Sequence, residues 1–189
     1  MFREGKTGTA HSVAASRGAV LSASEIQARI RTNPPLLERF IALKTQLQPN
    51  GFDLTLEQVA RFVGAGRIDF SNAERRLAET VPLQFEGDWL FLEPGAYKVQ
   101  FHEVIHLPRD IIALGAPRTS LLRSGVTVET GFWDAGFEGL SEALLVIFNT
   151  AGFYLKREAR LMQLVFLKLS EPASSGYRGV YAAEPRGTA

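Results

Sequence analysis

The sequence contains no cysteine among its 189 residues. This absence excludes disulfide bonds, thiolate zinc sites and thiol nucleophiles, and it fits a cytoplasmic protein. Long apolar runs are also missing: the longest, ALLVIF at 143–148, suits a buried strand and is far too short to span a bilayer. The first residues show no apolar segment followed by a cleavage site, so no secretory signal is expected. We therefore expect a cytoplasmic protein with no membrane partner.

Neither sign of charge dominates, because the formal net charge is +1. The overall electrostatics therefore give no case for nucleic acid as a partner. The three histidines, His11, His102 and His106, do not stand at a spacing that indicates a metal cluster. No G-x-S-x-G motif supports Ser-His-Asp catalysis. With 46% hydrophobic and 22% charged residues, the composition is that of a soluble globular protein.

Composition divides the chain into three parts. Residues 1–18 are rich in Gly, Ser, Thr and Ala without an apolar period, which predicts a flexible N-terminal tail. Residues 19–175 carry the apolar patterns and predict one folded domain. Residues 176–189, GYRGVYAAEPRGTA, cannot build a core and predict a flexible C-terminal arm.

Two short helices are expected near the start of the domain. Ser22 and Glu25 have the spacing of a capping box, and two isoleucines four residues apart mark one apolar face of a helix in 21–30. A pair of prolines at 34–35 ends it. The segment LLERFIALK at 36–44 predicts a second short helix.

Short strands and turns are expected to fill the rest of the domain. Residues 64–88 are polar and indicate a loop, with brief hydrophobic relief at 81–85. The strands are predicted at 52–59, on both sides of a Pro-Gly turn within 89–108, and at 111–114, 126–130, 143–148, 152–155 and 161–169. This pattern indicates an all-β sandwich or closed antiparallel architecture with short N-terminal helices, and it argues against βαβ units.

One carboxylate stands among aromatics and glycines in GFWDAGFEG, residues 131–139. A carboxylate in such surroundings serves as a general base if it reaches a water molecule. An aspartate in a tight turn also commonly caps backbone N–H groups. The local sequence leaves both roles open for Asp134.

A second candidate site follows the turn GAP. Arg118, Thr119 and Ser120 offer a guanidinium, two hydroxyls and backbone N–H groups, which together suit a phosphate or oxyanion. The segment lacks the P-loop pattern, and a polar turn between two strands explains it equally well. Gln163 is polar within an apolar strand that Arg160 shares, and it either binds a ligand or bonds to a neighbouring loop.

Taken in order, QPNGFDLTL, PRTSLLRSG, GFWDAGFEG, REARLMQLVF and a Gly-Tyr-containing tail resemble the dUTPase and dCTP deaminase superfamily. The similarity covers about residues 20–182 and is greatest to the archaeal-type dUTPase branch. The resemblance implies a distorted, jelly-roll-like β-clip fold. It also implies a homotrimer whose active sites form at subunit interfaces.

The resemblance also assigns roles at the reacting end of the nucleotide. Asp134 matches the base that activates water for attack on the α-phosphorus. Asp53 matches an aspartate that organises metal-bound water, with Mg²⁺ held mainly by the triphosphate and by waters. The positions matched to phosphate contacts are Arg118, Thr119, Ser120, Arg160 and Gln163, with Tyr177 and Arg178 added from the C-terminal arm.

Other matched positions concern the base and the sugar. Phe137 matches an aromatic residue that packs under the deoxyribose and leaves no room for a 2′-hydroxyl. Arg123 matches an arginine that deaminases use beside the base. The pyrimidine-reading hairpin corresponds to Val128, Glu129, Thr130, Gly131 and Phe132.

The resemblance leaves hydrolysis and deamination to be weighed. Deaminases of the superfamily carry a catalytic glutamate ten residues beyond the aspartate, and Leu144 stands there. A leucine cannot shuttle a proton, which favours hydrolysis of dUTP to dUMP and pyrophosphate. A bulge could bring nearby Glu142 to the base pocket, so a dCTP deaminase or a bifunctional enzyme is the alternative. A catalytically inactive nucleotide-binding regulatory protein is the second alternative.

Overall fold

The computed structural model describes residues 19–177 and residue 179. Its helices are short, namely α1 (Ala23–Ile30), α2 (Leu43–Gln46) and α3 (Thr119–Leu122). The strands are β1 (Leu37–Glu38), β2 (Leu47–Gln48), β3 (Gly51–Phe62), β4 (Thr80–Pro82), β5 (Trp89–Leu92), β6 (Gly95–His106), β7 (Ile111–Pro117), β8 (Val126–Glu129), β9 (Glu138–Ile147), β10 (Phe153–Lys156) and β11 (Arg160–Lys168). None of the helices in the described part of the chain has the length and apolar character needed to cross a membrane.

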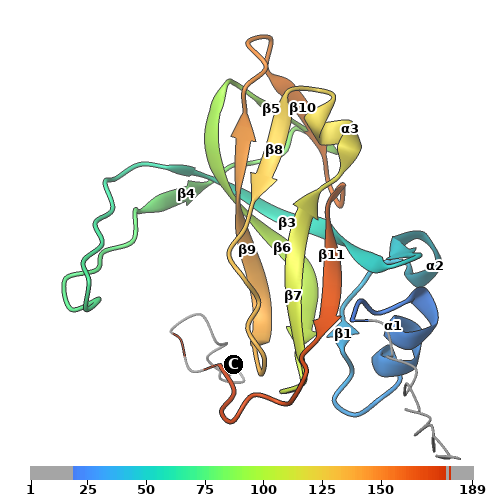
Figure 1. Cartoon of the computed structure of the whole chain (residues 1–189). Coiled ribbons are helices and arrows are strands. Elements are labelled where there is room, and N and C mark those ends of the chain that lie inside the picture. Colours follow the sequence, from blue (N-terminus) through green and yellow to red (C-terminus); the bar gives the residue numbers. More distant parts are fainter. Residues whose placement is uncertain (1–18, 178, 180–189) are drawn as a thin grey trace, which may run out of the picture.

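The strands form a strongly curved antiparallel sheet, so the all-β prediction is confirmed (Figure 1). Its main path runs β7-β11-β3-β6-β9-β8, with β1, β2 and β4 paired at its sides, while β5 and β10 form a separate two-stranded sheet. Just beyond β8, Trp133 bridges Ala113 of β7 through mutual backbone hydrogen bonds. The two ends of the sheet therefore meet, and the sheet nearly closes on itself. The enclosed core is apolar, with Phe52, Phe101 and Phe166 fully buried.

The first predicted helix is confirmed together with its capping box. The Glu25 N–H donates to Ser22 Oγ at 3.4 Å, and the Ser22 N–H donates to Glu25 Oε2 at 3.0 Å. Lys168 of β11 also donates to the Glu25 carboxylate, which ties α1 to the sheet. The Lys168 hydrogen bond, followed by those from Ser22, lowers the pKa of Glu25 to about 2.

The second predicted helix, at 36–44, is wrong. Leu37 pairs with Ile105 as part of β1, and helical structure begins only at Leu43. The two leucines at 36 and 37 are buried, so sheet contacts outweigh the local helical pattern. Arg39 has a φ of +61°, which a continuous helix cannot contain.

The predicted strands are all present, with shifted boundaries. The strand expected at 52–59 is the twelve-residue β3, and the one expected at 143–148 begins five residues earlier, at Glu138. The segment predicted as a loop at 64–88 contains the three-residue strand β4. The turn predicted at 118–120 instead leads into one helical turn, α3.

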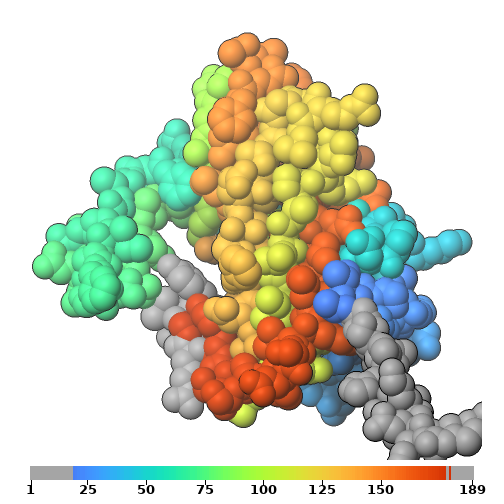
Figure 2. Space-filling view, in the orientation of Figure 1, coloured from blue at the N-terminus to red at the C-terminus, as the bar shows by residue number. Residues whose placement is uncertain are grey.

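An extended arm leaves the body between β3 and β4. We use "the arm" for residues 63–79, which appear in teal and green at the left of Figures 1 and 2. Its base is fixed where Phe62 pairs with Thr80, and Val63 donates a backbone hydrogen bond to Glu79. The arm is thus a continuation of two paired strands away from the core.

Candidate functional site

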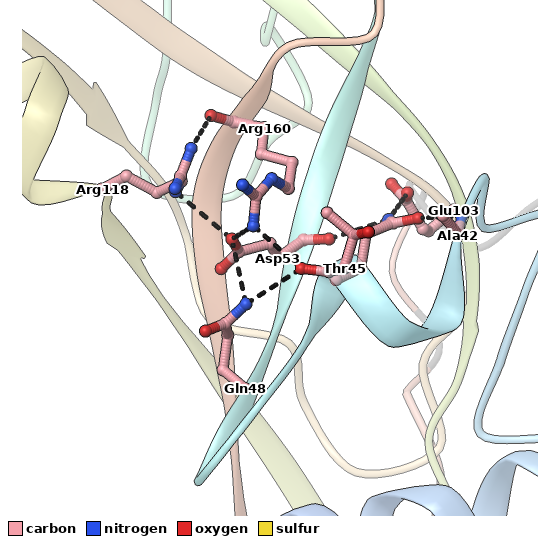
Figure 3. A network of polar contacts seen from close by, with 8 residues as sticks. Ala42, Thr45, Gln48, Asp53, Glu103, Arg118 and Arg160 are labelled. Atoms are coloured by element: carbon pink, nitrogen blue, oxygen red, sulfur yellow. Dashed lines mark hydrogen bonds and ion pairs between the residues drawn. The ribbon is translucent and has the colours of Figure 1, made fainter.

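Two polar groups from distant parts of the sequence meet at a buried carboxylate on β3. Asp53 is only 2% exposed. Its Oδ2 atom accepts a hydrogen bond from Arg160 Nη1 at 2.9 Å and lies 3.2 Å from Arg118 Nε, as Figure 3 shows. Gln48 Nε2 is at 3.5 Å from the same oxygen. We call these four residues the Asp53 cluster.

Neighbouring strands bring the cluster together. Gln163 on β11 stands directly opposite Asp53 on β3 and opposite Ala116 on β7. Arg118 follows the end of β7 and donates to the backbone oxygen of Arg160 at 3.2 Å. Of the residues predicted to contact phosphates, Arg118, Arg160 and Gln163 therefore lie close to the predicted Asp53.

Burial and the neighbouring arginines act in opposite directions on the pKa of the Asp53 carboxylate. Burial raises the pKa of Asp53 above its ordinary value of 3.8, and the nearby Arg118 and Arg160 guanidiniums, which lower the pKa, do not fully offset burial. The folded chain therefore holds this proton more tightly than the unfolded chain does. The contribution of this titration to stability is present below the ordinary pKa and is lost as pH rises through the folded pKa.

We expect the Asp53 side chain to titrate above 3.8 in the folded protein. Carbon-13 NMR of the aspartate carboxyl carbons measures this, with the Asp53→Asn variant identifying the resonance. A midpoint below 3.8 would mean that the two guanidiniums outweigh burial, and would contradict the expectation.

A second buried carboxylate is connected to the Asp53 cluster through hydrogen bonds. Glu103 on β6 is 0% exposed and accepts hydrogen bonds from Gln46 Nε2 at 2.6 Å, from the Thr55 N–H at 2.9 Å and from Thr55 Oγ1 at 2.6 Å. Gln46 Nε2 also donates to the backbone oxygen of Asp53 at 3.0 Å. The Glu103 network thus fixes the backbone that carries Asp53.

The same network holds α2 against the cluster. Gln46 Oε1 accepts from the N–H groups of Ile41 and Ala42, both at 2.8 Å. One residue earlier, the Thr45 carbonyl accepts from Arg160 Nη1 at 2.9 Å. Figure 3 shows this chain of contacts from α2 to Arg160. Neither Gln46 nor Glu103 was predicted from the sequence. The signal for Glu103 was a glutamate at a core-facing position of an alternating strand.

A separate cavity of about 430 Å³ opens beside the predicted Asp134 turn. We call it the aromatic pocket, and it is lined by Gln100, Gly131, Phe132, Trp133, Phe137, Leu140, Ser141, Glu142 and Tyr177. Trp133 Nε1 donates to Ser141 Oγ at 2.7 Å, which fixes the indole. The rings of Phe137 and Tyr177 are 5.7 Å apart, so the start of the predicted C-terminal arm already contacts the pocket.

Asp134 lies in the tight turn at the edge of this pocket. Its backbone oxygen accepts the Phe137 N–H at 3.0 Å, whereas its exposed carboxylate makes no hydrogen bond or ion pair within residues 19–177. Gly136 has a φ of +81°, and a Cβ there would stand 2.6 Å from Gly176 Cα. The turn is therefore closed by its backbone, and the carboxylate is left available to solvent.

The Asp53 cluster and the Asp134 turn lie far apart within one chain. Trp133, next to Asp134, bridges Ala113 near the start of β7, whereas Arg118 follows the end of that strand. Five residues of extended strand separate Ala113 from Arg118, which corresponds to about 16 Å. A single chain therefore does not bring the predicted base next to the predicted phosphate-binding arginines.

Glu142 lines the aromatic pocket without the β9 bulge that the sequence suggested. It pairs with Gln100 in regular register, and its carboxylate accepts from Lys98 Nζ at 2.8 Å. The register irregularity lies between Gln100 and Val104, on β6. Leu144, on the same exposed side of β9, is not among the residues that line the pocket.

The remaining predicted residues lie outside both groups. Thr119 and Ser120 are exposed in α3, and Arg123 is exposed at its end. The hairpin position Val128 is buried in the core, the Glu129 carboxylate accepts from Thr127, and Thr130 is half-buried. Arg178 lies outside the described residues.

The described side chains include no group of three or more His, Cys, Asp or Glu able to enclose a metal ion. Among the described residues, the contacts of the Asp53 carboxylate are made by Oδ2, which leaves Oδ1 without a donor. Magnesium binds mainly through waters and substrate phosphates and needs only one or two carboxylates. These residues therefore fit Mg²⁺ carried by a polyphosphate and do not fit a metal site made of protein ligands alone.

The family model and the curated relatives that match this chain indicate the same protein family. The model of the dCTP deaminase-like family matches residues 20–169. A probable deoxyuridine 5′-triphosphate nucleotidohydrolase from Methanosarcina mazei is 47% identical over 167 residues, covering 88% of this chain and 98% of the relative. One of the same name from Archaeoglobus fulgidus is 46% identical over 166 residues, covering 88% and 97%.

Among solved structures, the 2′-deoxycytidine 5′-triphosphate deaminase from Agrobacterium tumefaciens matches with a TM-score of 0.63 at 23% identity. The match covers 79% of this chain and 48% of the deaminase, so this chain corresponds to about half of that protein's length. At this identity the likeness shows a shared fold.

Proposed function

The chain belongs to the dCTP deaminase-like family, and we propose that it hydrolyses dUTP to dUMP and pyrophosphate. The strongest support is the identity of 43–47% to archaeal relatives named as probable dUTP nucleotidohydrolases, over nearly their whole length. A leucine at the position of the deaminase glutamate supports the same reaction, because it cannot transfer a proton.

We propose that the aromatic pocket receives the deoxyuridine. Phe137 and Phe132 offer apolar faces, and Gln100 and Ser141 offer polar groups for orientation. Phe137 is 7% exposed and packed against the core, so it can limit the space beneath a sugar. A fixed ring in that place would favour deoxyribose over ribose.

The triphosphate is assigned to the Asp53 cluster. Arg118 and Arg160 are about 30% exposed at their side chains, with values of 32% and 28%, so both guanidiniums reach solvent while they contact Asp53. Guanidinium groups bind phosphate oxygens in two-point geometry. Gln163 stands beside Asp53 and can donate to a phosphate oxygen from the neighbouring strand.

In the proposed reaction, Asp134 accepts a proton from the attacking water. Its exposed carboxylate, without a partner among the described residues, supports this role. The water then attacks the α-phosphorus, and pyrophosphate leaves. Arg118 and Arg160 stabilise the negative charge of the phosphates, and Gln163 donates a hydrogen bond to them. Phosphoryl transfer depends chiefly on such positioning and electrostatic stabilisation.

We propose that Mg²⁺ is the cofactor and binds together with the triphosphate. When bound, the ion neutralises phosphate charge and limits the freedom of the chain of phosphates. Asp53 is the residue that would contact it, through water at Oδ1, in keeping with the preference of Mg²⁺ for retained waters.

A homotrimer with active sites between subunits accounts for the split arrangement. The base and the phosphate-binding arginines must act on one triphosphate, yet about 16 Å of strand separates their anchor points in one chain. In the proposed assembly, the aromatic pocket of one copy faces the Asp53 cluster of another. The protein would then be inactive as a monomer.

A second candidate function, deamination of dCTP, is favoured by one observation: Glu142 lines the aromatic pocket. Its ion pair with Lys98 supports a structural role instead. The two carboxylates of interest, Glu142 and Asp134, can be separated by experiment, because each reaction would depend on a different one.

We expect purified protein with Mg²⁺ to convert dUTP to dUMP and pyrophosphate and to leave dCTP unchanged. Chromatography of the products identifies them. The Glu142→Gln variant should retain the kcat of dUTP hydrolysis within about threefold, because the amide keeps the shape of the pocket wall and Glu142 is not proposed to act on the phosphates or the attacking water. Formation of dUTP from dCTP, lost in Glu142→Gln, would establish a deaminase. Product from neither nucleotide would favour the inactive binding protein.

A further inference from the structure

We propose that the arm binds a second copy of this chain and stabilises the assembly. The inference rests on the proposed function for the existence of an assembly, and it goes beyond that function in naming the segment that holds the copies together. It concerns a part of the chain that contributes to neither the Asp53 cluster nor the aromatic pocket.

The arm exposes three large apolar side chains within ten residues of sequence. Phe70 is 106% exposed, Ile68 is 82% exposed and Leu77 is 61% exposed. None of the three is among the described residues packed against the core. Isolated exposed apolar residues are ordinary, but several on one projecting segment indicate a surface that another protein covers.

The tip of the arm is a hydrogen-bonded turn that contains Phe70. Arg67 and Arg76 bond to each other through their backbones at 2.8 and 2.9 Å. Between them, the Asp69 carboxylate accepts from Ser71 Oγ at 2.6 Å and from the N–H of Glu74 at 3.3 Å. The Ser71 hydroxyl is the main cause that lowers the pKa of Asp69. The neighbours of Phe70 are therefore held by hydrogen bonds, although the ring itself is fully exposed.

The direction of the arm places its tip beyond the reach of its own core. From the end of β3 at Phe62, eight residues lead to Phe70, which gives a reach of up to about 26 Å in extended conformation. Figures 1 and 2 show the segment projecting away from the sheet. The apolar side chains therefore need a surface supplied by another molecule.

A second copy of this chain is the occupant that the observations favour. The proposed function already places a second copy against this chain, because Asp134 and the Asp53 cluster lie apart in one chain, and the arm leaves from the end of β3 opposite to Asp53. The charges near the tip have both signs, with Arg67 and Arg76 beside Asp69 and Glu74. Such a mixture suits a protein surface of nearly neutral net charge, whereas nucleic acid and anionic membranes select clustered positive charge.

The test compares the wild type with an Ile68→Ser, Phe70→Ser double variant by sedimentation velocity. We expect the wild type to sediment as an oligomer and the double variant to shift towards monomer at the same micromolar concentration. The dissociated double variant should remain folded and show one cooperative thermal unfolding transition, because neither side chain packs against its own core. A Phe148→Ser variant, altered at an exposed phenylalanine that directly follows β9 and belongs to neither the Asp53 cluster nor the aromatic pocket, is the matched control and should remain oligomeric.

Cross-linking identifies the partner directly, because the chain has no native cysteine. Ala73→Cys, labelled with a benzophenone maleimide, places a photoreactive group on the exposed tip. In a mixture of nitrogen-14 and nitrogen-15 protein, we expect cross-linked peptides that join the two isotopes. Cross-links confined to one isotope would overturn the proposal, as would a monomeric wild type or a double variant of unchanged mass. These measurements do not use dUTP, so a failure of the proposed hydrolysis would be seen separately, in the product assay.

Discussion

The Asp134→Asn variant is expected to hydrolyse dUTP about 10³-fold more slowly than the wild type, within the usual range for loss of a general base. Asparagine keeps the size of the side chain but cannot accept the proton from water. The turn should persist, because the contact that closes it uses the Asp134 backbone oxygen and the Phe137 N–H. Steady-state kinetics should therefore show a fall in kcat with little change in the affinity for a non-hydrolysable dUTP analogue.

Glu138→Gln is the matched control for this experiment. Glu138 is an exposed carboxylate four residues after Asp134, and its nearest described partner is His106 Nδ1 at 3.3 Å. Its conversion to the amide should leave kcat close to the wild-type value. Full activity of Asp134→Asn would remove Asp134 as the base, and an equal loss in both variants would indicate a general effect of charge near the pocket.

The Glu103→Ala variant is expected to lose about 3 kcal/mol or more of unfolding free energy. The change leaves three buried donors without their acceptor: Gln46 Nε2, the Thr55 N–H and Thr55 Oγ1. Each orphaned buried polar group costs about 1–3 kcal/mol, and the removed side chain also leaves a cavity. For a chain of this size the expected decrease in Tm is about 6–12 °C.

Calorimetry or chemical denaturation measures this loss, with Glu142→Ala as the control. Glu142 is an exposed carboxylate on the adjacent strand β9, paired with Lys98, and surface pairs contribute at most about 1 kcal/mol. Glu103→Gln, which keeps the shape but presents an amide to the same donors, should fall between the two. Equal stability of Glu103→Ala and Glu142→Ala would contradict the structural role of the Glu103 network.

The strands and the first helix could be predicted because their signals are local. Alternation placed β3, β6 and β9 approximately, and the spacing of Ser22 and Glu25 placed the start of α1 correctly. The second helix failed because Leu36 and Leu37 bury against the sheet, a contact that lies nearly seventy residues away at Ile105. Local pattern carries no information on such a partner.

The candidate site could be predicted only in part, for the same reason. Ordered motifs selected Asp53, Arg118, Arg160 and Gln163, which the sheet brings together. The distance between Asp134 and Arg118 depends on how β7 spans the sheet, which the motifs do not encode. Glu103 was missed because a single buried carboxylate looks like any other glutamate until its donors, on α2 and β3, are located.

The close approach of Gly136 and Gly176 has a practical consequence for handling this protein. Tyr177 donates its N–H to the Ala135 oxygen, so the chain passes the mouth of the aromatic pocket as it leaves the described domain. At the other end, Val20 enters beside Leu167 of β11, seven residues along that strand from Arg160. The described domain therefore ends beside the pocket, whereas it begins away from the Asp53 cluster. A tag inserted directly after Tyr177 is expected to weaken nucleotide binding more than one inserted directly before Val20.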